Sequence, residues 1–529
     1  MDRRDAGLTR LSLPGRIGAT ACTTMVLTVL AFGLLWPLIR LLDVAGLSAE
    51  TITSARFRGI WWFTIWQAIA STCLALAVGL PLTWALSAWR WPGQAIVRAV
   101  TITPFVLPPV VIGLAVAYAL PGTGRTGVGW LLAGHVMVNL AVVVRMVGPA
   151  WQQLDDTPRQ AARTLGAGPL RTFALVTMPV LRRAILGAAA VVLLFCLSSF
   201  GMAKLLLGGG RSTIEVEIAR QALQLTRADR AAALGIAQLT LAVLVLTAAA
   251  WFGRRSSAVA TSATPRQARC ARERITVALA VVPISLIVAW PMGALVYRSM
   301  VSHGAVDLSG YRSLTDHQRS SALAHAPIDS IVISIRYAMI AALITVVVAT
   351  AAVLVSSRRY GPAITALVTI PMAISAVLLG LGALLSSQWL PYRWESIAVP
   401  LTHAVIALPL AYRSMDAVAS TIDADVRAAA ALAGASPSQV WWWIDRPILQ
   451  RAMLSGAALA AAVSLGEFGA ATFLARADSP TVPVAIVRLL GRPGAINARM
   501  ALALAVVLMI MVSSAAVAAD RFGRMDGRR

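Results

Sequence analysis

The chain has 529 residues, of which 58% are hydrophobic and only 13% are charged. Soluble globular domains usually carry about 25% charged residues, so this composition argues against a water-soluble fold. The formal net charge of +24 would suit a nucleic-acid-binding protein, but the basic residues lie between and beside apolar stretches rather than in one cluster. We therefore predict an all-α polytopic membrane protein that does not bind nucleic acid.

Twelve apolar segments along the chain are long enough to cross a bilayer core, which needs about 20 mostly apolar residues. They are residues 17–39, 60–88, 99–120, 130–151, 184–207, 231–251, 275–296, 328–355, 363–385, 396–412, 452–473 and 501–519. The first follows several arginines but is too long for a signal peptide, so we expect an uncleaved span. The tenth is short and contains Pro400 and Pro409, which makes it the weakest match to a membrane span among the twelve.

A polar segment separates these spans into two groups of six. Residues 254–274 are rich in Ser, Thr and Arg and lack apolar periodicity, which is typical of a linker. The sequence therefore predicts two membrane domains, residues 1–253 and 275–529, joined by a linker at 254–274.

The distribution of arginine predicts the orientation of the chain. An even number of spans places both ends on one side, and that side also receives the basic linker. Because short basic segments stay in the cytoplasm, we expect both termini to be cytoplasmic and the protein to lie in a bacterial inner membrane. The bias is incomplete, since segments expected outside also contain arginines such as Arg211 and Arg220.

The two halves repeat one another. A shift of 268 residues places His135 on His403, and residues 155–183 match residues 423–451 at ten of 29 positions without a gap. Six spans per copy is an even number, so the two copies have the same orientation in the membrane.

The matched stretch follows the fourth span of each half, and we call residues 155–183 the first loop and residues 423–451 the second loop. Each predicts a short helix, a glycine break and a second short helix that a proline stops. This spacing resembles the Glu-Ala-Ala motif of ABC importer permeases, in which Glu-Ala-Ala, three residues, Gly, nine residues and Ile-x-Leu-Pro follow one another. The matching residues are Gln160, Ala161, Ala162, Gly166 and Pro179 in the first loop, and Ala428, Ala429, Ala430, Gly434 and Pro447 in the second.

The resemblance implies a role for each loop. In that family the loop is a coupling helix that docks on an ATPase subunit and transmits its movement to the spans. It implies two copies of an ABC ATPase and an extracytoplasmic substrate-binding protein as partners. The motif's Glu is replaced by Gln160 and Ala428, so no specific salt bridge from that position is expected. The alternative is two amphipathic interfacial loops that serve packing alone.

Few other residues suggest chemistry. Glu467, inside the eleventh span, either faces the translocation pathway and meets a cationic substrate or hydrogen-bonds to a neighbouring helix. His135 and His403 suggest a shared interhelical hydrogen bond. Cysteines and histidines lack metal-ligand spacing, and no Walker, serine-elbow or HExxH motif occurs. We expect no catalytic residue, metal site or cofactor.

The substrate is indicated only by resemblance. Fused permeases of this size resemble the thiamine and iron(III) importer families, and residues 135–145 and 205–218 look more like the thiamine permeases. Thiamine is the expected substrate and iron(III) or another small solute the alternative, with selectivity mostly in the binding protein. A rival from another class is an ion-driven secondary transporter, which predicts interrupted helices at the midplane and no paired cytoplasmic loop. A membrane-embedded enzyme would need a catalytic constellation, and the sequence shows none.

Overall fold

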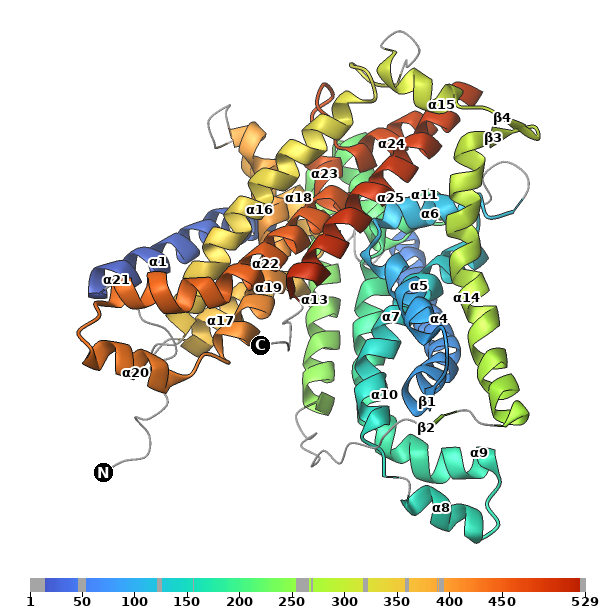
Figure 1. The fold of residues 1–529 in the computed structure, drawn as a ribbon. Coiled ribbons are helices and arrows are strands. Elements are labelled where there is room, and N and C mark those ends of the chain that lie inside the picture. The colour runs from blue at the N-terminus through green and yellow to red at the C-terminus, as the bar shows by residue number, and fades with distance from the viewer. Residues whose placement is uncertain are drawn as a thin grey trace. The chain divides into compact units, whose positions relative to one another are not determined.

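The computed structural model describes residues 15–45, 54–120, 126–155, 157–253, 266–267, 270–316, 322–356, 361–387, 389 and 394–523. Helices dominate this part of the chain (Figure 1). Ten helices within it are long and apolar enough to cross a membrane, or up to twelve if each of two bent helix pairs is one span. The predicted all-α polytopic fold is confirmed. Most of the predicted linker at 254–274 lies outside the described residues.

The chain divides into two compact units, which we describe separately. Unit 1 comprises residues 1–48, 218–236 and 307–529, and unit 2 comprises residues 49–217 and 237–306. The first span of each sequence half therefore belongs to the unit that contains most of the other half. Compact units and sequence halves are different divisions of the chain, and the domains at 1–253 and 275–529 stay a prediction about the duplication.

Unit 2 is built on α4 (Ala55–Ala88) and α7 (Val128–Gln152), which pack along one another. Gly79 allows this approach, because a Cβ there would lie 2.9 Å from the Val143 side chain. The other elements are β1 (Trp89–Arg90), α5 (Gln94–Val106), α6 (Pro109–Ala117), α8 (Thr157–Thr164), α9 (Pro169–Thr172), η2 (Phe173–Thr177), α10 (Met178–Leu197), α11 (Phe200–Leu206), β2 (Arg266–Gln267), α14 (Ala271–Met300), β3 (Val301–Ser302) and β4 (Ala305–Val306). Strand β1 pairs with β2 in parallel and β3 with β4 antiparallel.

Unit 1 is built on α16 (Asp329–Ser356), α19 (Trp394–Ala419), α22 (Arg446–Gly466) and α25 (Ala495–Gly523), whose facing sides are rich in alanine. Its other elements are α1 (Gly15–Leu30), η1 (Ala31–Leu35), α2 (Trp36–Val44), η3 (Arg220–Gln224), α15 (Ser309–Arg312), η4 (Ser313–Thr315), α17 (Gly361–Thr369), η5 (Ile370–Ala373), α18 (Ala376–Ser387), α20 (Ala424–Leu432), α21 (Pro437–Val440), η6 (Trp441–Asp445), α23 (Gly469–Leu474) and α24 (Val482–Leu490). Helices α12 (Ile214–Ala219) and α13 (Ala228–Gly253) lie partly in each unit.

The third and ninth predicted spans are bent pairs of helices. Helices α5 and α6 meet at 109°, and Gly361–Ala373 meets α18 at 98°. Leu107 is extended, with a ψ of 148°, because the residue before a proline avoids the helical region and Pro108 follows. Ile374 is likewise extended, with a ψ of 130°, after the short η5 turn.

The fifth and eleventh predicted spans, residues 184–207 and 452–473, are each interrupted by a break in the helix. The fifth runs over Leu170–Leu197, breaks, and continues as α11. The eleventh runs over Pro437–Gly466, breaks at Glu467, and continues as α23. The tenth span, by contrast, is a continuous helix through Pro400 and Pro409, because packing of α19 against α16 and α22 outweighs the hydrogen bonds that the prolines remove.

Candidate functional site

The first loop begins with a capped helix. The Asp155 carboxylate accepts a hydrogen bond from the Thr157 N–H at 2.9 Å, which with the Thr157 hydroxyl lowers the pKa of Asp155. Helix α8 then ends at Thr164, and Gly166, two residues later, has a φ of 81°, which lies in the left-handed region. The Ala167 N–H donates to the Ala162 carbonyl at 2.9 Å, which closes a glycine-terminated helix end. Glycine occupies this position because it adopts positive φ without steric cost.

The second loop repeats this geometry. The Asp423 carboxylate accepts from the Asp425 N–H at 3.0 Å, and Gly434, two residues after α20 ends, has a φ of 83°. The Ala435 N–H donates to the Ala430 carbonyl at 3.0 Å. Each of these residues lies 268 positions after its counterpart in the first loop. The sequence repeat is therefore also a repeat of backbone conformation.

Both loops return to a long helix through a π-helical turn. These turns, η2 and η6, are again 268 residues apart, and each is followed by a proline in the first turn of α10 or α22. Because Pro179 and Pro447 have no N–H to donate to the carbonyl four residues earlier, the hydrogen-bond register shifts there. The sequence predicted the prolines as helix stops, whereas the structure shows the helix continuing through them.

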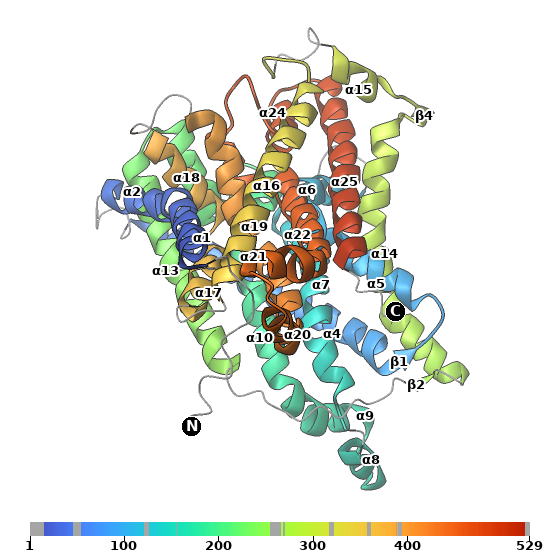
Figure 2. The ribbon, with the colours of Figure 1, turned by 60° about the vertical axis from the view of Figure 1, so that its left-hand side comes forward.

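The predicted loop residues occupy equivalent places in the two copies. Gln160 and Ala428 are exposed on α8 and α20, and both glycines are exposed at the helix ends. The alanine pairs Ala161–Ala162 and Ala429–Ala430 lie beside them on the same helices. Figures 1 and 2 show α8 and α9 beyond one end of α10, and α20 and α21 beyond one end of α22.

Large apolar side chains project from both loops. Leu165 is 87% exposed and Leu432 is 90% exposed, each at the end of the first short helix. Trp443, at the position equivalent to the exposed Leu175, is 81% exposed. Each loop thus exposes more than one large apolar side chain, and patches of exposed apolar surface mark contacts with a protein or a membrane. The sequence reasoning missed both leucines, although their position directly before the glycine region was the available signal.

The second loop has a buried ion pair that the first lacks. The Arg427 Nε lies 2.8 Å from the Asp445 Oδ1, and both side chains are buried. The register places Arg159 and Thr177 at these positions in the first loop, so the carboxylate is absent there. Asp445 is the last residue of η6, so its contact with Arg427 links η6 to α20. The sequence did not indicate Asp445 as a site residue.

Glu467 lies at the break between α22 and α23. Its Oε2 is 3.4 Å from His403 Nε2 and accepts a hydrogen bond from the Ala471 N–H at 3.0 Å. The other ring nitrogen, His403 Nδ1, lies 2.8 Å from the Ser464 hydroxyl. Glu467 thus caps α23 and contacts a histidine of α19, and its carboxylate is almost fully buried.

The equivalent histidine of the first half has a different neighbourhood. His135 Nδ1 lies 2.8 Å from the Ser71 hydroxyl of α4, so each histidine makes the expected interhelical contact. Asn139, one turn on, donates to Cys196 Sγ at 3.5 Å, and Gln67 donates to the Cys196 carbonyl at 3.1 Å. These polar groups hold α4, α7 and α10 together. Among the described residues, no group of three His, Cys, Asp or Glu side chains could hold a metal ion.

Comparison with known proteins identifies the family. No protein-family model matches the sequence. The thiamine transport system permease protein ThiP of Brucella abortus (strain 2308) is 27% identical over 482 residues, covering 87% of this chain and 86% of the relative. ThiP of Escherichia coli (strain K12) is 25% identical over 534 residues, covering 89% and 96%. The chain is an ABC importer permease.

A shorter relative adds information about size. The sulfate transport system permease protein CysT of Escherichia coli (strain K12) is 28% identical over 226 residues, which is 39% of this permease and 81% of CysT. Most of one CysT chain therefore corresponds to less than half of this permease. The relatives are transport permeases, a non-catalytic role, and with the apolar helices they identify a multi-pass inner-membrane protein.

Proposed function

We propose that this permease forms the translocation pathway of an ATP-driven importer for thiamine. The observation that carries the proposal is the pair of loops with identical backbone geometry and exposed apolar side chains, in a chain similar to two thiamine permeases over most of its length. The same role for iron(III) or another small solute is the alternative.

Each loop is proposed to bind one copy of an ABC ATPase. The hydrogen-bonded helix ends at Gly166 and Gly434 fix the angle between the short helices, so Leu165 and Leu432 are presented on a preorganised surface. Neither Gln160 nor Ala428 supplies the motif's carboxylate, so docking would rest on apolar contact rather than on an ion pair at this position. The chain itself would not hydrolyse ATP.

The loops define the proposed orientation. If they meet an ATPase, they lie in the cytoplasm, as do the arginine-rich ends of the chain. An extracytoplasmic binding protein would deliver the substrate at the opposite face, and the two homologous halves would move against one another in alternating access.

Glu467 is proposed to contribute to the pathway at the helix break. A carboxylate there would suit a cationic solute such as thiamine, but its contacts with His403 and the Ala471 N–H are those of a group that holds the break in place. The two roles are compatible if the carboxylate exchanges partners during transport.

The alternative class, an ion-driven secondary transporter, predicts interrupted helices, and the fifth and eleventh spans are interrupted. The break therefore does not distinguish the two classes. The paired loops and the permease relatives favour the ATP-driven class.

Reconstitution tests the proposal. The permease, its ATPase and its binding protein are placed in proteoliposomes, and uptake of labelled thiamine and of labelled iron(III) is measured with and without ATP. We expect ATP-dependent uptake of thiamine. ATP-dependent uptake of iron(III) alone would reassign the substrate, and uptake driven by an ion gradient without ATP would overturn the proposal.

A further inference from the structure

Three buried side chains of the first half each have one polar atom without a hydrogen-bond partner. Gln67 of α4 and His135 and Asn139 of α7 are at most 1% exposed. Within the described part of the chain, nothing bonds to Gln67 Oε1, His135 Nε2 or Asn139 Oδ1. An unpaired polar atom in a membrane interior costs free energy, because no water is there to replace the missing partner. Three such atoms therefore point to a partner that these helices do not supply.

The donor groups of both amides are already engaged. Gln67 Nε2 donates to the carbonyls of Thr64 and Cys196, both at 3.1 Å. Asn139 Nδ2 donates to the His135 carbonyl at 2.9 Å and to Cys196 Sγ at 3.5 Å. These bonds set the orientation of each amide and leave its oxygen as a hydrogen-bond acceptor. We call Gln67, His135, Asn139 and Cys196 together the polar interface.

The polar interface lies at the depth of the membrane core, beside a helix break. Gln67 is 12 residues after Ala55, which is about 18 Å along a helix of 34 residues. Cys196 precedes the last residue of α10, and the Ser199 hydroxyl donates to the Cys196 carbonyl at 3.1 Å. Interrupted helices commonly form solute sites in transporters, because their unwound backbone and side chains offer polar groups inside the membrane.

The corresponding helices of the second half are packed with alanine. Ala342 of α16, Ala407 of α19 and Ala460 of α22 form a buried apolar cluster. The repeat places Ala407 at the position of Asn139, so the amide oxygen of Asn139 has no counterpart there. The two halves therefore offer different chemistry where these helices meet.

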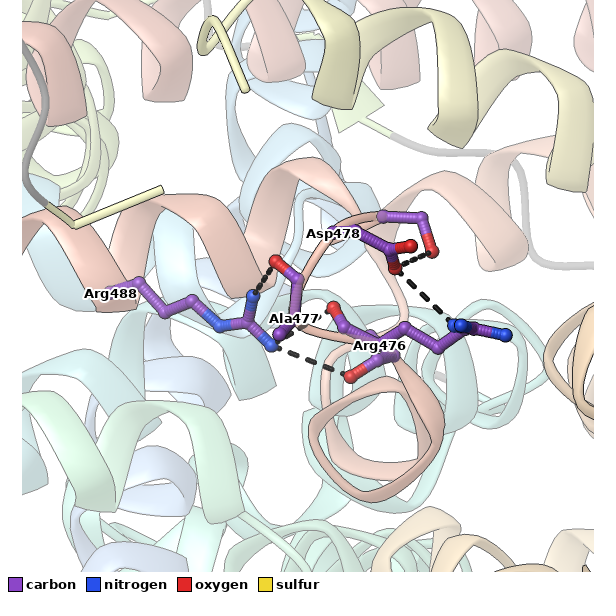
Figure 3. Close-up of polar contacts among 6 residues, drawn as sticks. Arg476, Ala477, Asp478 and Arg488 are labelled. Atoms are coloured by element: carbon purple, nitrogen blue, oxygen red, sulfur yellow. Dashed lines mark hydrogen bonds and ion pairs between the residues drawn. The ribbon is translucent and has the colours of Figure 1, made fainter. Parts of the chain in front are cut away.

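The segments that follow the two helix breaks also differ. In the second half, Arg488 donates to the carbonyls of Arg476 at 3.2 Å and Ala477 at 3.0 Å (Figure 3). The repeat places Gly208 and Gly209 at these two positions in the first half, and both are exposed. Glycine has the largest backbone freedom of any residue. The chain after the first-half break is therefore the more adjustable of the two.

We propose that the polar interface is a solute-binding site of the first half, which opens when α10 separates from α4 and α7 and takes a solute with N–H donors. This rests on the proposed function. The amide oxygens of Gln67 and Asn139 accept from an amino group on a heteroaromatic ring, and thiamine has such a group on its pyrimidine ring. Gln67, His135 and Asn139 supply no carboxylate, whereas iron(III) is a hard ion that prefers anionic oxygen ligands. The site therefore favours thiamine over iron(III).

Cys196 is a native probe of this opening, because its side chain is fully buried in the closed interface. The other three cysteines are removed as Cys22→Ala, Cys73→Ala and Cys270→Ser, the last of which preserves the N-cap of α14. The complex with ATPase and binding protein is placed in nanodiscs and treated with a small cationic methanethiosulfonate reagent. Intact-mass spectrometry of the permease measures the modification of Cys196.

Transport is expected to expose the thiol. Modification of Cys196 should be at least about tenfold faster during ATP hydrolysis than without nucleotide, and thiamine, but not iron(III), should slow it. The matched control is Ala407→Cys in a chain that also has Cys196→Ala, and this thiol in the alanine cluster should stay unmodified. Asn139→Ala, which copies the second half, should keep the modification but raise the thiamine concentration for half-protection about tenfold. If Asn139 only holds helices together, its loss instead lowers the thermal midpoint and leaves the protection by thiamine unchanged.

The outcomes separate this site from the proposed function. A wild-type complex without ATP-dependent uptake of thiamine in proteoliposomes would count against the importer itself. Normal uptake with Cys196 unmodified during turnover, or equal modification in Ala407→Cys, would overturn the assignment of the site to the first half. Modification that thiamine does not slow, or that iron(III) slows instead, would overturn the solute class.

Discussion

Gly166 and Gly434, 268 residues apart, adopt the same left-handed backbone conformation, with φ values of 81° and 83°. A side chain at either position costs roughly 1–2 kcal/mol, and a β-branched one more, because its Cβ approaches the following carbonyl oxygen. No neighbouring atom lies within 4 Å of a Cβ built at either glycine, so the cost is one of backbone conformation and not of packing.

Valine at Gly166 or Gly434 is therefore expected to loosen the affected loop while the spans stay folded. Hydrogen exchange should increase within residues 157–177 or 425–445 and nowhere else. Gly168→Val is the matched control, because that glycine is equally open and does not have positive φ. Equal loosening by Gly168→Val would show that the left-handed conformation is not what holds the loop.

Breaking the Arg427–Asp445 pair is expected to destabilise the second loop. Asp445→Thr, which copies the first-loop residue, leaves the buried Arg427 without this carboxylate, and loss of one partner of a buried pair costs about 3–5 kcal/mol. We expect a lower thermal midpoint and weaker ATPase binding. Arg427→Met combined with Asp445→Leu should recover much of the loss. If Asp445→Thr matched the wild type in both measurements, the pair would have no structural role.

Substitution of the exposed leucines tests whether the loops contact the ATPase, because it should leave the stability of the fold unchanged. Leu165→Glu and Leu432→Glu are expected to weaken ATPase binding tenfold or more, because an apolar anchor is replaced by a charge at a desolvated contact. Thermal stability should stay within about 0.5 kcal/mol, as is usual for surface substitutions. If binding to the ATPase is kept but binding to lipid vesicles falls, the loops are interfacial elements instead.

Exchange of Glu467 with its first-half counterpart tests whether the helix break needs the carboxylate. Glu467→Ser removes both the contact with His403 and the cap on the Ala471 N–H, so we expect uptake to fall at least tenfold. Comparison with Glu467→Gln separates the roles, because the amide oxygen can still accept from Ala471 but has no charge. Near-normal uptake by Glu467→Gln indicates a cap, and loss of uptake with a normal thermal midpoint indicates a charge in the pathway.

Acidification tests the anchor of α15. Hydrogen bonds from the Ser309 N–H and hydroxyl and from Arg499 lower the pKa of Asp307 to about 2. A depressed pKa means that the contribution is present above the ordinary carboxyl pKa near 4 and is lost as the pH falls through about 2. The thermal midpoint of Asp307→Asn should lie below that of the wild type at pH 6, and the difference should shrink between pH 4 and pH 2. A difference that does not change with pH would contradict this assignment.

Sequence patterns predicted the spans and the repeat because both depend on local composition. Apolar length determines where a helix can cross, and matched residues such as Asp155 and Asp423 turned out to cap equivalent helices. Tertiary contacts decided the rest. Pro400 and Pro409 lie in a continuous helix supported by its neighbours, whereas Ser199 and Glu467 lie at breaks that no run of apolar residues reveals.

The candidate site was predicted in part for the same reason. The glycines and prolines of both loops impose local backbone geometry, which a motif can record. The contact between Asp445 and Arg427 bridges 18 residues, and the exposure of Leu165 and Leu432 depends on how the whole loop projects. Neither feature follows from residue type alone.

Native mass spectrometry of the permease with its ATPase tests the central claim most directly. The account predicts two ATPase copies on the wild-type chain, one on Gly166→Val or Gly434→Val, and none on the double variant. Two ATPase copies retained by the double variant would contradict the assignment of these loops as the docking sites.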